Sequence, residues 1–332
     1  MTLCTLSYAQ ENVMTGNNRE ETVRIDGLLY YLDRQTHTAM IANGNQWQGE
    51  LDIPEQLTYE GNTYGVTKME WLAFSSCSTL TKVRIPKTIN SIEHYADHEA
   101  CKNPFSGCTS LEAIEVDDEN AWMCSVDGVL FSKDKTQLYS YPAGARRNAY
   151  SIPEGVTWIG GRAFAQNTYL TSVEMPNSVT HMCFGTFSGC KNLRSVRLSE
   201  RLSSISARTF ENCSSMLFLD IPASVGEFQE SVFRWSAIKN LVVRGTFPSG
   251  LRTDTFYFMD NEATAYVQQS EIEKFKSLFP GTVLPLETYS SIVGNQKPKS
   301  VSNSSAYDLQ GRRIDSPAAR GVYIQNGRKV VK

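Results

Sequence analysis

The chain has 332 residues, 41% of them apolar, which suffices for a sizeable core and excludes a chain too polar to collapse. Its 32 Lys and Arg nearly balance 35 Asp and Glu, and the net charge of -3 argues against a nucleic-acid-binding protein. The apolar runs are far shorter than the roughly 18 residues that span a bilayer, so no membrane insertion is expected.

The first 65 residues divide into two parts. In residues 1–22, Ser7-Tyr8-Ala9 matches the small-residue pattern that precedes a signal-peptidase cut. We interpret this part as a signal-peptide remnant with a disordered N-terminus; an ordinary disordered N-terminus is the alternative. Residues 23–65 are predicted to form an N-terminal β cap, because they contain an alternating segment at 25–31 and lead into a hairpin-like segment at 58–66.

Residues 66–245 repeat with a period of 23 residues. Two sets of apolar residues follow this period, namely Phe164, Phe187, Phe210 and Phe233, and Ile152, Met175, Leu198 and Ile221. Earlier copies surround Phe74 and Phe105, which are eight residues farther apart. Each unit contains a short alternating segment such as Val196-Arg197-Leu198, which is typical of a strand with its outer residues buried and its middle residue exposed. One unit cannot bury its own apolar edge, so the units are predicted to stack into a solenoid.

An insert and a cap interrupt the repeat. Residues 117–149 are predicted to form a β-hairpin insert that turns at 133–136. Residues 246–289 are predicted to cap the array, with Tyr266-Val267 as the final strand. Ser270 and Glu273 form a potential capping box for a helix that would run to Phe279.

The C-terminal segment separates into a linker and a tail. Residues 290–305 lack apolar periodicity and contain Lys-Pro-Lys and Ser-Asn-Ser-Ser, which is typical of a linker. In residues 306–332, two alternating segments follow, at 306–314 and 320–331. The second is predicted to turn at Asn326-Gly327.

These motifs together resemble the BspA-like leucine-rich repeat family of surface and secreted bacterial proteins, over roughly residues 23–289. The fold class expected is a β-rich α/β solenoid: a right-handed leucine-rich repeat solenoid with roughly 23-residue coils, a β-hairpin insert and terminal caps. The resemblance implies a monomeric, extracellular or cell-surface adhesion protein of a Bacteroides-like bacterium, exported across the inner membrane. Its implied partner is a host or neighbouring-cell surface protein, with a glycan as a second candidate. Residues 306–332 resemble the C-terminal sorting domains of type IX secretion cargo.

The candidate ligand-binding residues lie on the outward side of the predicted strands, which form the concave face of the solenoid. They are Arg84, Glu115, Glu174, Arg197, Phe218 and Asp220. Lys82, Ser172, Ser195 and Asn240 fall in a neighbouring column with Phe218. Exposed ion pairs contribute only about 0–1 kcal/mol and need no functional reason, so rung-to-rung pairing is favoured for any single charged residue, whereas binding is favoured for the surface as a whole. Phe218 is the best anchor candidate, because aromatic residues dominate binding hot spots.

No catalytic, metal or cofactor site is predicted. His94, His98 and Cys101 resemble part of a metal site but lack a complete coordination shell. Asp117-Asp118 directly follows a predicted strand, where a solvated turn is favoured over glycoside chemistry. Protein binding is therefore favoured over three alternatives: an envelope structural protein, a carbohydrate-binding module and a hydrolase with an unrecognised site.

Four cysteines share one position, three residues after the phenylalanine of their repeat. They are Cys77, Cys108, Cys190 and Cys213. Neighbouring coils would place them close enough for disulfides, but Asn167 and Ser236 occupy the same position in other coils. The pattern therefore favours a column of buried free thiols that pack as apolar residues.

Overall fold

The computed structural model describes most of the chain, namely residues 21–93, 102–247 and 251–289 and four short strands between 306 and 331. The chain divides into a large unit, residues 1–286, and a small unit, residues 287–332. Four predictions fall outside the described residues: the signal-peptide remnant, the cluster of His94, His98 and Cys101, the linker at 290–305, and the turn at 326–327.

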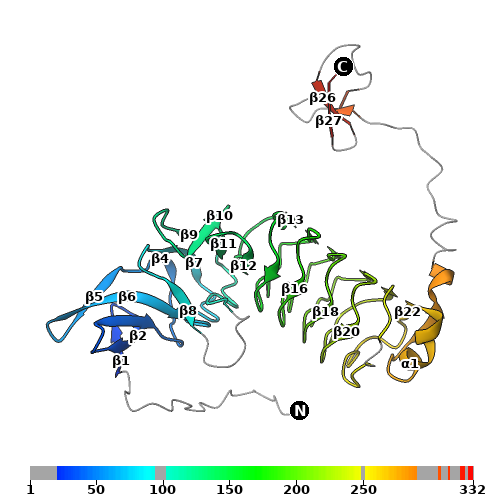
Figure 1. Ribbon diagram of the computed structural model, residues 1–332, viewed down its shortest axis with the longest axis horizontal. Helices are drawn as coiled ribbons and strands as arrows, with labels where there is room; N and C mark the ends of the chain where they lie inside the picture. The colour runs from blue at the N-terminus through cyan, green and yellow to red at the C-terminus, as the bar shows by residue number, and fades with distance from the viewer. Residues whose placement is uncertain are drawn as a thin grey trace. The chain divides into compact units, whose positions relative to one another are not determined.

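A six-stranded sheet begins the large unit (Figure 1). Its strands are β1 (Glu21–Ile25), β2 (Leu28–Asp33), β3 (Thr38–Ile41), β5 (Gln56–Tyr59), β6 (Asn62–Glu70) and β8 (Ser91–Glu93). The expected hairpin at 58–66 is confirmed, since Tyr59 pairs with Asn62 across a two-residue turn. Both turn residues have positive φ, 49° at Glu60 and 79° at Gly61, as the tightest hairpin turns require.

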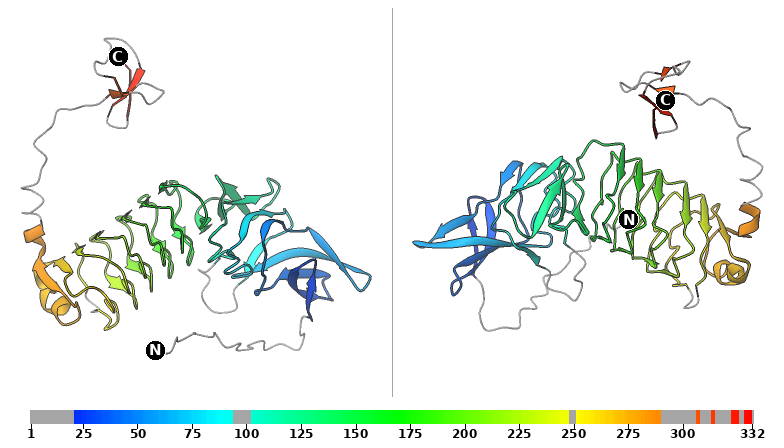
Figure 2. Two further views of the ribbon diagram at one scale, coloured as in Figure 1. Left: turned by 180° about the vertical axis from the view of Figure 1, so that it is seen from behind. Right: turned by 45° about the horizontal axis from the view of Figure 1, so that its top comes forward.

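Parallel strands then stack coil upon coil in two groups, seen side by side in Figure 2. The first stack contains β4 (Gly49–Asp52), β7 (Leu80–Ile85) and β9 (Ala113–Val116). The second stack contains β13 (Ala149–Ser151), β15 (Ser172–Glu174), β17 (Ser195–Arg197), β19 (Phe218–Ile221), β21 (Asn240–Val243), β22 (Thr264–Val267) and β23 (Thr282–Pro285). We call the outward surface of both stacks the strand face.

Shorter strands return along the coils, as the repeat length requires. They are β14 (Trp158–Ile159), β16 (His181–Met182), β18 (Ser204–Ile205) and β20 (Glu227–Phe228). They pair in parallel at the 23-residue period, for example Ile159 with Met182. Each coil therefore has strand pairing on two sides and an apolar interior between them.

The predicted phenylalanine set forms a continuous column of stacked rings in that interior. Ring centroids lie 5.2 Å apart for Phe164 and Phe187, 5.8 Å for Phe187 and Phe210, and 6.1 Å for Phe210 and Phe233. All four rings are fully buried. Stacking of coils thus converts a period in the sequence into contact in space.

The cysteine column is buried beside these rings, and its described members are free thiols. The prediction of plain apolar packing misses one feature, because each thiol also donates a hydrogen bond to a carbonyl of the preceding coil. Cys190 Sγ lies 3.1 Å from Phe164 O, and Cys213 Sγ lies 3.3 Å from Phe187 O. Where the column holds Asn167, its Nδ2 donates to Pro142 O at 3.2 Å instead. The position therefore favours a small side chain that can donate a hydrogen bond.

The hairpin insert separates two hydrophobic cores. It contains β10 (Met123–Val126), β11 (Val129–Ser132) and β12 (Gln137–Ser140), and β11 and β12 are joined at 133–136 as predicted. Successive side chains of β11 point to opposite sides: Leu130 packs in the first core, whereas Val129 and Phe131 pack in the second. This period of two explains why all four residues of β11 are buried.

Two details of the predicted C-terminal cap are wrong. The strand at Tyr266 is not the last, because β23 pairs with it in parallel. The capping box does not form: Ser270 lies within the 3₁₀ helix Gln269–Glu271, and α1 runs only from Ile272 to Lys276. Glu273 is instead exposed and pairs with Lys276 at 2.9 Å.

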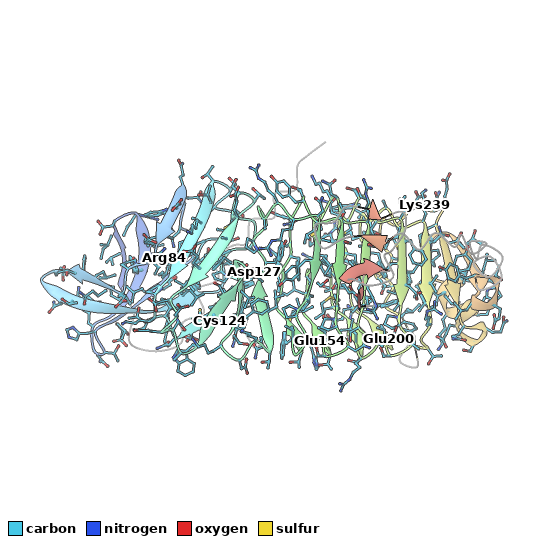
Figure 3. The ribbon with its side chains drawn as sticks, turned by 90° about the horizontal axis from the view of Figure 1, so that it is seen from above. Arg84, Cys124, Asp127, Glu154, Glu200 and Lys239 are labelled. Atoms are coloured by element: carbon cyan, nitrogen blue, oxygen red, sulfur yellow. The ribbon has the colours of Figure 1, made fainter. Side chains whose placement is uncertain are left out.

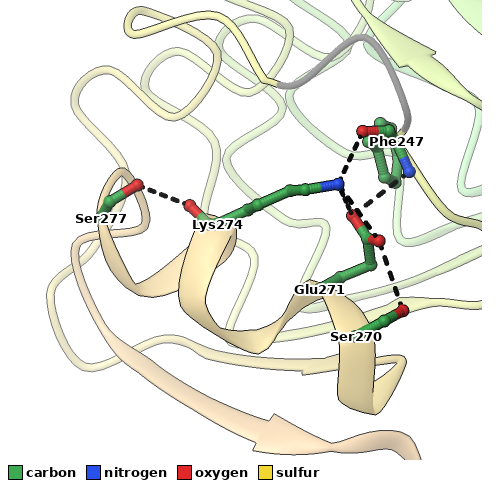
Figure 4. A network of polar contacts seen from close by, with 5 residues as sticks. All are labelled: Phe247, Ser270, Glu271, Lys274 and Ser277. Carbon is green, nitrogen blue, oxygen red and sulfur yellow. Dashed lines mark hydrogen bonds and ion pairs between the residues drawn. The ribbon is translucent and has the colours of Figure 1, made fainter.

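Glu271 explains this difference (Figure 4). Its buried carboxylate accepts a hydrogen bond from the Phe247 amide at 3.2 Å and pairs with Lys274 at 3.2 Å. Lys274 Nζ also donates to Phe247 O at 3.0 Å. These contacts attach the cap to the chain segment after β21 and fix the start of α1 without a capping box.

The small unit holds a four-stranded sheet ordered β25-β24-β26-β27. Its strands are β24 (Ala306–Tyr307), β25 (Arg313–Ile314), β26 (Val322–Gln325) and β27 (Arg328–Val331). Gln325 pairs with Arg328, so β26 and β27 are antiparallel neighbours.

Candidate binding face

The strand register places the predicted outward residues in columns. Arg84 lies opposite Glu115 in the first stack, and Glu174 lies opposite Arg197 in the second. In Figure 3 the strands are seen from above, with Arg84 over the first stack and Glu200 and Lys239 at opposite edges of the second. Side chains alternate between the two sides of a strand, and equivalent residues recur once per coil. Together these two periods determine which outward side chains are neighbours.

A groove with a volume of about 880 Å³ lies on the second stack. It crosses β13, β15, β17 and β19, and its lining includes Tyr150, Ser172, Ser195 and Phe218. The two serines are short side chains between larger neighbours, which leaves space above the sheet. Phe218 retains 38% of its surface exposed and is the groove's exposed aromatic residue.

Two ion pairs between neighbouring coils border the groove. Arg197 Nη1 lies 2.5 Å from Glu174 Oε1, and Arg244 binds both carboxylate oxygens of Asp220 at 2.7 Å. All four side chains are at least one-third exposed. Exposed pairs contribute only about 0–1 kcal/mol to stability, so breaking these two ion pairs to contact a ligand would lose little folding stability.

Four of the six predicted residues therefore gather at one place: Glu174, Arg197, Phe218 and Asp220 line the groove. Arg84 and Glu115 lie on the first stack, outside it. There Glu115 pairs with Lys82 at 2.6 Å and with Arg84 at 3.2 Å. The hydrogen bond from Lys82, with a further one from Arg84, lowers the pKa of the Glu115 carboxyl.

Sequence reasoning missed several groove residues. Arg244 follows β21 directly, and its charge opposes that of Asp220 one coil earlier, which is a signal that could have identified it. Tyr150 and Glu200 also line the groove but lie outside the outward columns that were considered. Tyr150 is at an inward position of β13, in register with Val173, and Glu200 lies in the turn after β17.

The residues considered for catalysis or metal binding can be placed only where they fall within the described ranges. Asp117 forms a turn after β9, in which its Oδ1 accepts the Glu119 amide at 2.8 Å. Within the described ranges, no three His, Cys, Asp or Glu side chains are grouped to hold a metal ion. None of the described helices is both long and apolar enough to cross a membrane.

The stacked coils, the buried phenylalanine column and the in-register parallel strands define a leucine-rich repeat protein. A family model described as the BspA type leucine rich repeat region matches six copies, over residues 67–143 and 144–261. These matches cover more than half of the sequence, and the chain belongs to the BspA-type leucine-rich repeat family. No curated protein matches it.

Several solved structures are similar to this chain at low sequence identity. The pneumococcal vaccine antigen PcpA is 16% identical with a TM-score of 0.48, covering 80% of this chain and 98% of that one. A leucine-rich cell surface protein from Faecalibacterium prausnitzii is 15% identical with a TM-score of 0.47, covering 80% and 99%. A leucine-rich repeat protein from Bacteroides ovatus is 23% identical with a TM-score of 0.44, covering 79% and 76%.

Proposed function

We propose that this protein is secreted or displayed on the cell surface and binds another protein through the strand face, with the groove on the second stack at the centre of contact. The location agrees with that of a similar protein, the leucine-rich cell surface protein from Faecalibacterium prausnitzii. The partner class is a surface protein of a host or a neighbouring cell, which gives the chain a role in adhesion.

The observation that carries this proposal is an exposed aromatic side chain in a charged groove. Phe218 is surrounded by Glu174, Arg197, Asp220 and Arg244, two acids and two bases that neutralise each other in the free protein. Binding hot spots combine an aromatic anchor with a polar rim that excludes water. The groove supplies both elements on the strands of consecutive coils.

The test is a binding screen with the full chain. Immobilised protein would be exposed to a panel of purified extracellular-matrix proteins and cell-surface ectodomains, and the affinity of each hit measured by interferometry. Phe218→Ala should weaken binding about tenfold or more, as expected for loss of a hot-spot anchor.

Tyr169→Ala is the matched control, because Tyr169 is also 38% exposed but lies outside the groove lining. It should leave the affinity unchanged. A Phe218→Ala variant that binds within twofold of the wild type, or a panel without a hit, contradicts the proposed function.

For the small unit we propose a role in sorting to the cell surface by type IX secretion. Its support is that residues 287–332 form a separate unit with its own four-stranded sheet. In a host with this export machinery, a chain ending at Tyr289 should reach the surface in much smaller amounts than the full chain, both carrying an intact signal peptide. Equal surface amounts contradict this role, and a large fall in melting temperature would show that the tail stabilises the repeat array.

A further inference from the structure

Three aromatic side chains lie exposed on the turns of the last coils, outside the groove lining. Trp235, Tyr257 and Phe258 keep 50%, 54% and 51% of their surfaces exposed. Trp235 precedes β21 and Phe258 precedes β22, so they belong to consecutive coils. Large apolar side chains grouped at a surface commonly mark a binding site.

Their backbone conformation makes these aromatic residues unexpected. Trp235 and Phe258 occupy the second position after the buried phenylalanine of their coils, with φ of 54° and 59°. The same left-handed position is held in other coils by smaller or polar residues, namely Ser76, Gly107, Gln166, Gly189 and Asn212. Gly and Asn adopt this conformation at low cost, whereas a bulky aromatic residue is strained there. The coil's own stability therefore does not explain Trp235 and Phe258.

The rings leave one face of the indole open. The Trp235 and Phe258 rings stack at 5.5 Å with an interplanar angle of 22°, and Arg234 Cζ lies 4.0 Å from the Trp235 centroid. Arg234 Cζ is also only 5.5 Å from the Phe258 centroid. Groups on opposite faces of an indole would lie farther from each other than either lies from the ring. Arg234 and Phe258 therefore share one face of Trp235, and the exposed half of the side chain includes the other.

Arg234 adds hydrogen-bonding capacity beside this open face. Its Nε is buried without a hydrogen-bond partner, and its Nη1 is 3.7 Å from Glu211, which is beyond hydrogen-bond distance. A guanidinium has five N–H donors in a fixed plane, and 27% of the Arg234 side chain is exposed. In the same two turns, the buried Oδ1 of Asp254 lies 3.5 Å from Arg252 Nε. A partly exposed guanidinium beside an exposed aromatic face indicates a ligand that is both apolar and rich in hydroxyl groups.

We infer that Trp235, Phe258 and Arg234 form a binding site for a neutral oligosaccharide, separate from the strand face. The C–H face of a pyranose ring would pack on the open face of Trp235, where the π-system is negative, and its hydroxyl groups would accept hydrogen bonds from Arg234. Arg234 and Arg252 are each paired with acids of these turns, Glu211, Glu230 and Asp254, so little unpaired positive charge remains for an acidic sugar. The exposed rings offer an area suited to one sugar unit, which is much smaller than the area that a stable protein interface buries.

The test uses the full chain on an array of neutral, sialylated and uronate-containing oligosaccharides, followed by calorimetry on the neutral hits. Trp235→Asn and Phe258→Asn restore the type of residue that Asn212 provides in the preceding coil. Each should weaken binding of a neutral oligosaccharide about tenfold or more, while the melting temperature stays equal or rises because backbone strain is relieved. Trp122→Ala is the control, since Trp122 is 60% exposed on the distant hairpin insert, and it should bind normally.

Several results would overturn the inference. These are an array without neutral hits, preferential binding of the acidic sugars, or Trp235→Asn and Phe258→Asn variants that bind within twofold of the wild type. A clear fall in melting temperature for both variants would show that the rings serve the fold. None of these outcomes depends on the protein screen against the strand face, so this inference and the proposed function can fail separately.

Discussion

The first and second stacks share one framework but present different surfaces. In the first stack Lys82 and Arg84 both reach Glu115, and the hairpin insert packs against Ala113 of β9. In the second stack the corresponding column contains Ser172 and Ser195, and a groove opens above them. The sheet geometry is parallel in both. Long paired side chains and the insert therefore fill the first stack, whereas short side chains leave part of the second stack hollow.

The interiors differ much less than the surfaces. Phe74 and Phe105 stack at 5.5 Å in the first core, as Phe164 and Phe187 do at 5.2 Å in the second. Cys108 donates to Phe74 O at 3.0 Å, as Cys190 donates to Phe164 O at 3.1 Å. Inward positions thus maintain the coil in both stacks, whereas the outward side chains differ between them.

The largest expected effect comes from opening the shared interior. Phe187→Ala should lower the free energy of unfolding by about 3–5 kcal/mol, because the cavity would lie between two stacked rings in a fully packed core. Urea denaturation followed by circular dichroism measures the change. Phe218→Ala, on the strand face of the same stack, should cost far less. A loss under about 1 kcal/mol for Phe187→Ala would show that the repeat register is wrong.

The hairpin insert allows the two cores to be perturbed separately. Leu130→Ala should cost about 2–5 kcal/mol and loosen the first core, because its side chain packs there. Its neighbour Val129 packs in the second core, so Val129→Ala should loosen that core instead. Amide hydrogen exchange in β7 and in β15 distinguishes the two responses. If both variants accelerate exchange equally in the two strands, the hairpin does not separate the cores.

The buried thiols should make stability fall at alkaline pH. Burial raises the pKa of Cys190 to about 12, and it also raises the pKa of Cys213 well above 9.0. Between pH 9 and the native pKa the unfolded chain releases a proton that the native state keeps, so each thiol lowers stability by up to about 1.4 kcal/mol per pH unit. Cys213→Ser keeps a donor for Phe187 O without titrating in this range.

The measurement is the slope of unfolding free energy against pH, from 8 to 10.5, for the wild type and Cys213→Ser. The variant should show a shallower decline. Parallel curves would exclude Cys213 as a buried titrating thiol, and a thiol assay on denatured, unreduced protein should find most of the eight cysteines free.

The smallest expected effects come from the ion pairs of the strand face. Glu174→Gln should change the free energy of unfolding by less than about 1 kcal/mol, because Glu174 and Arg197 are 54% and 66% exposed. Glu115→Gln should cost slightly more, since Glu115 pairs with two cations rather than one. Thermal melts at low and high salt compare the two variants. A larger loss for Glu174→Gln would contradict the view that the first stack is the more tightly paired surface.

By itself the sequence determined the repeat and much of the strand face. The period alone places Phe164 and Phe187 in one buried column and Glu174 opposite Arg197. The reason is that in-register stacking makes residues one period apart into neighbours in space. Hairpin turns at 58–66 and 133–136 were equally accessible, because turn residues and alternating strands lie close together in the chain.

Tertiary structure alone decided the features that break this period. Glu271 determines how the cap begins by reaching the Phe247 amide, a contact across 24 positions that no local motif encodes. The groove also depends on Tyr150, at an inward position of β13, and on Glu200, in the turn after β17. The open face of Trp235 depends on a positive φ and on where Arg234 lies. A period predicts which residues recur, but the direction of each side chain is set by backbone angles and by neighbours that the folded chain brings together.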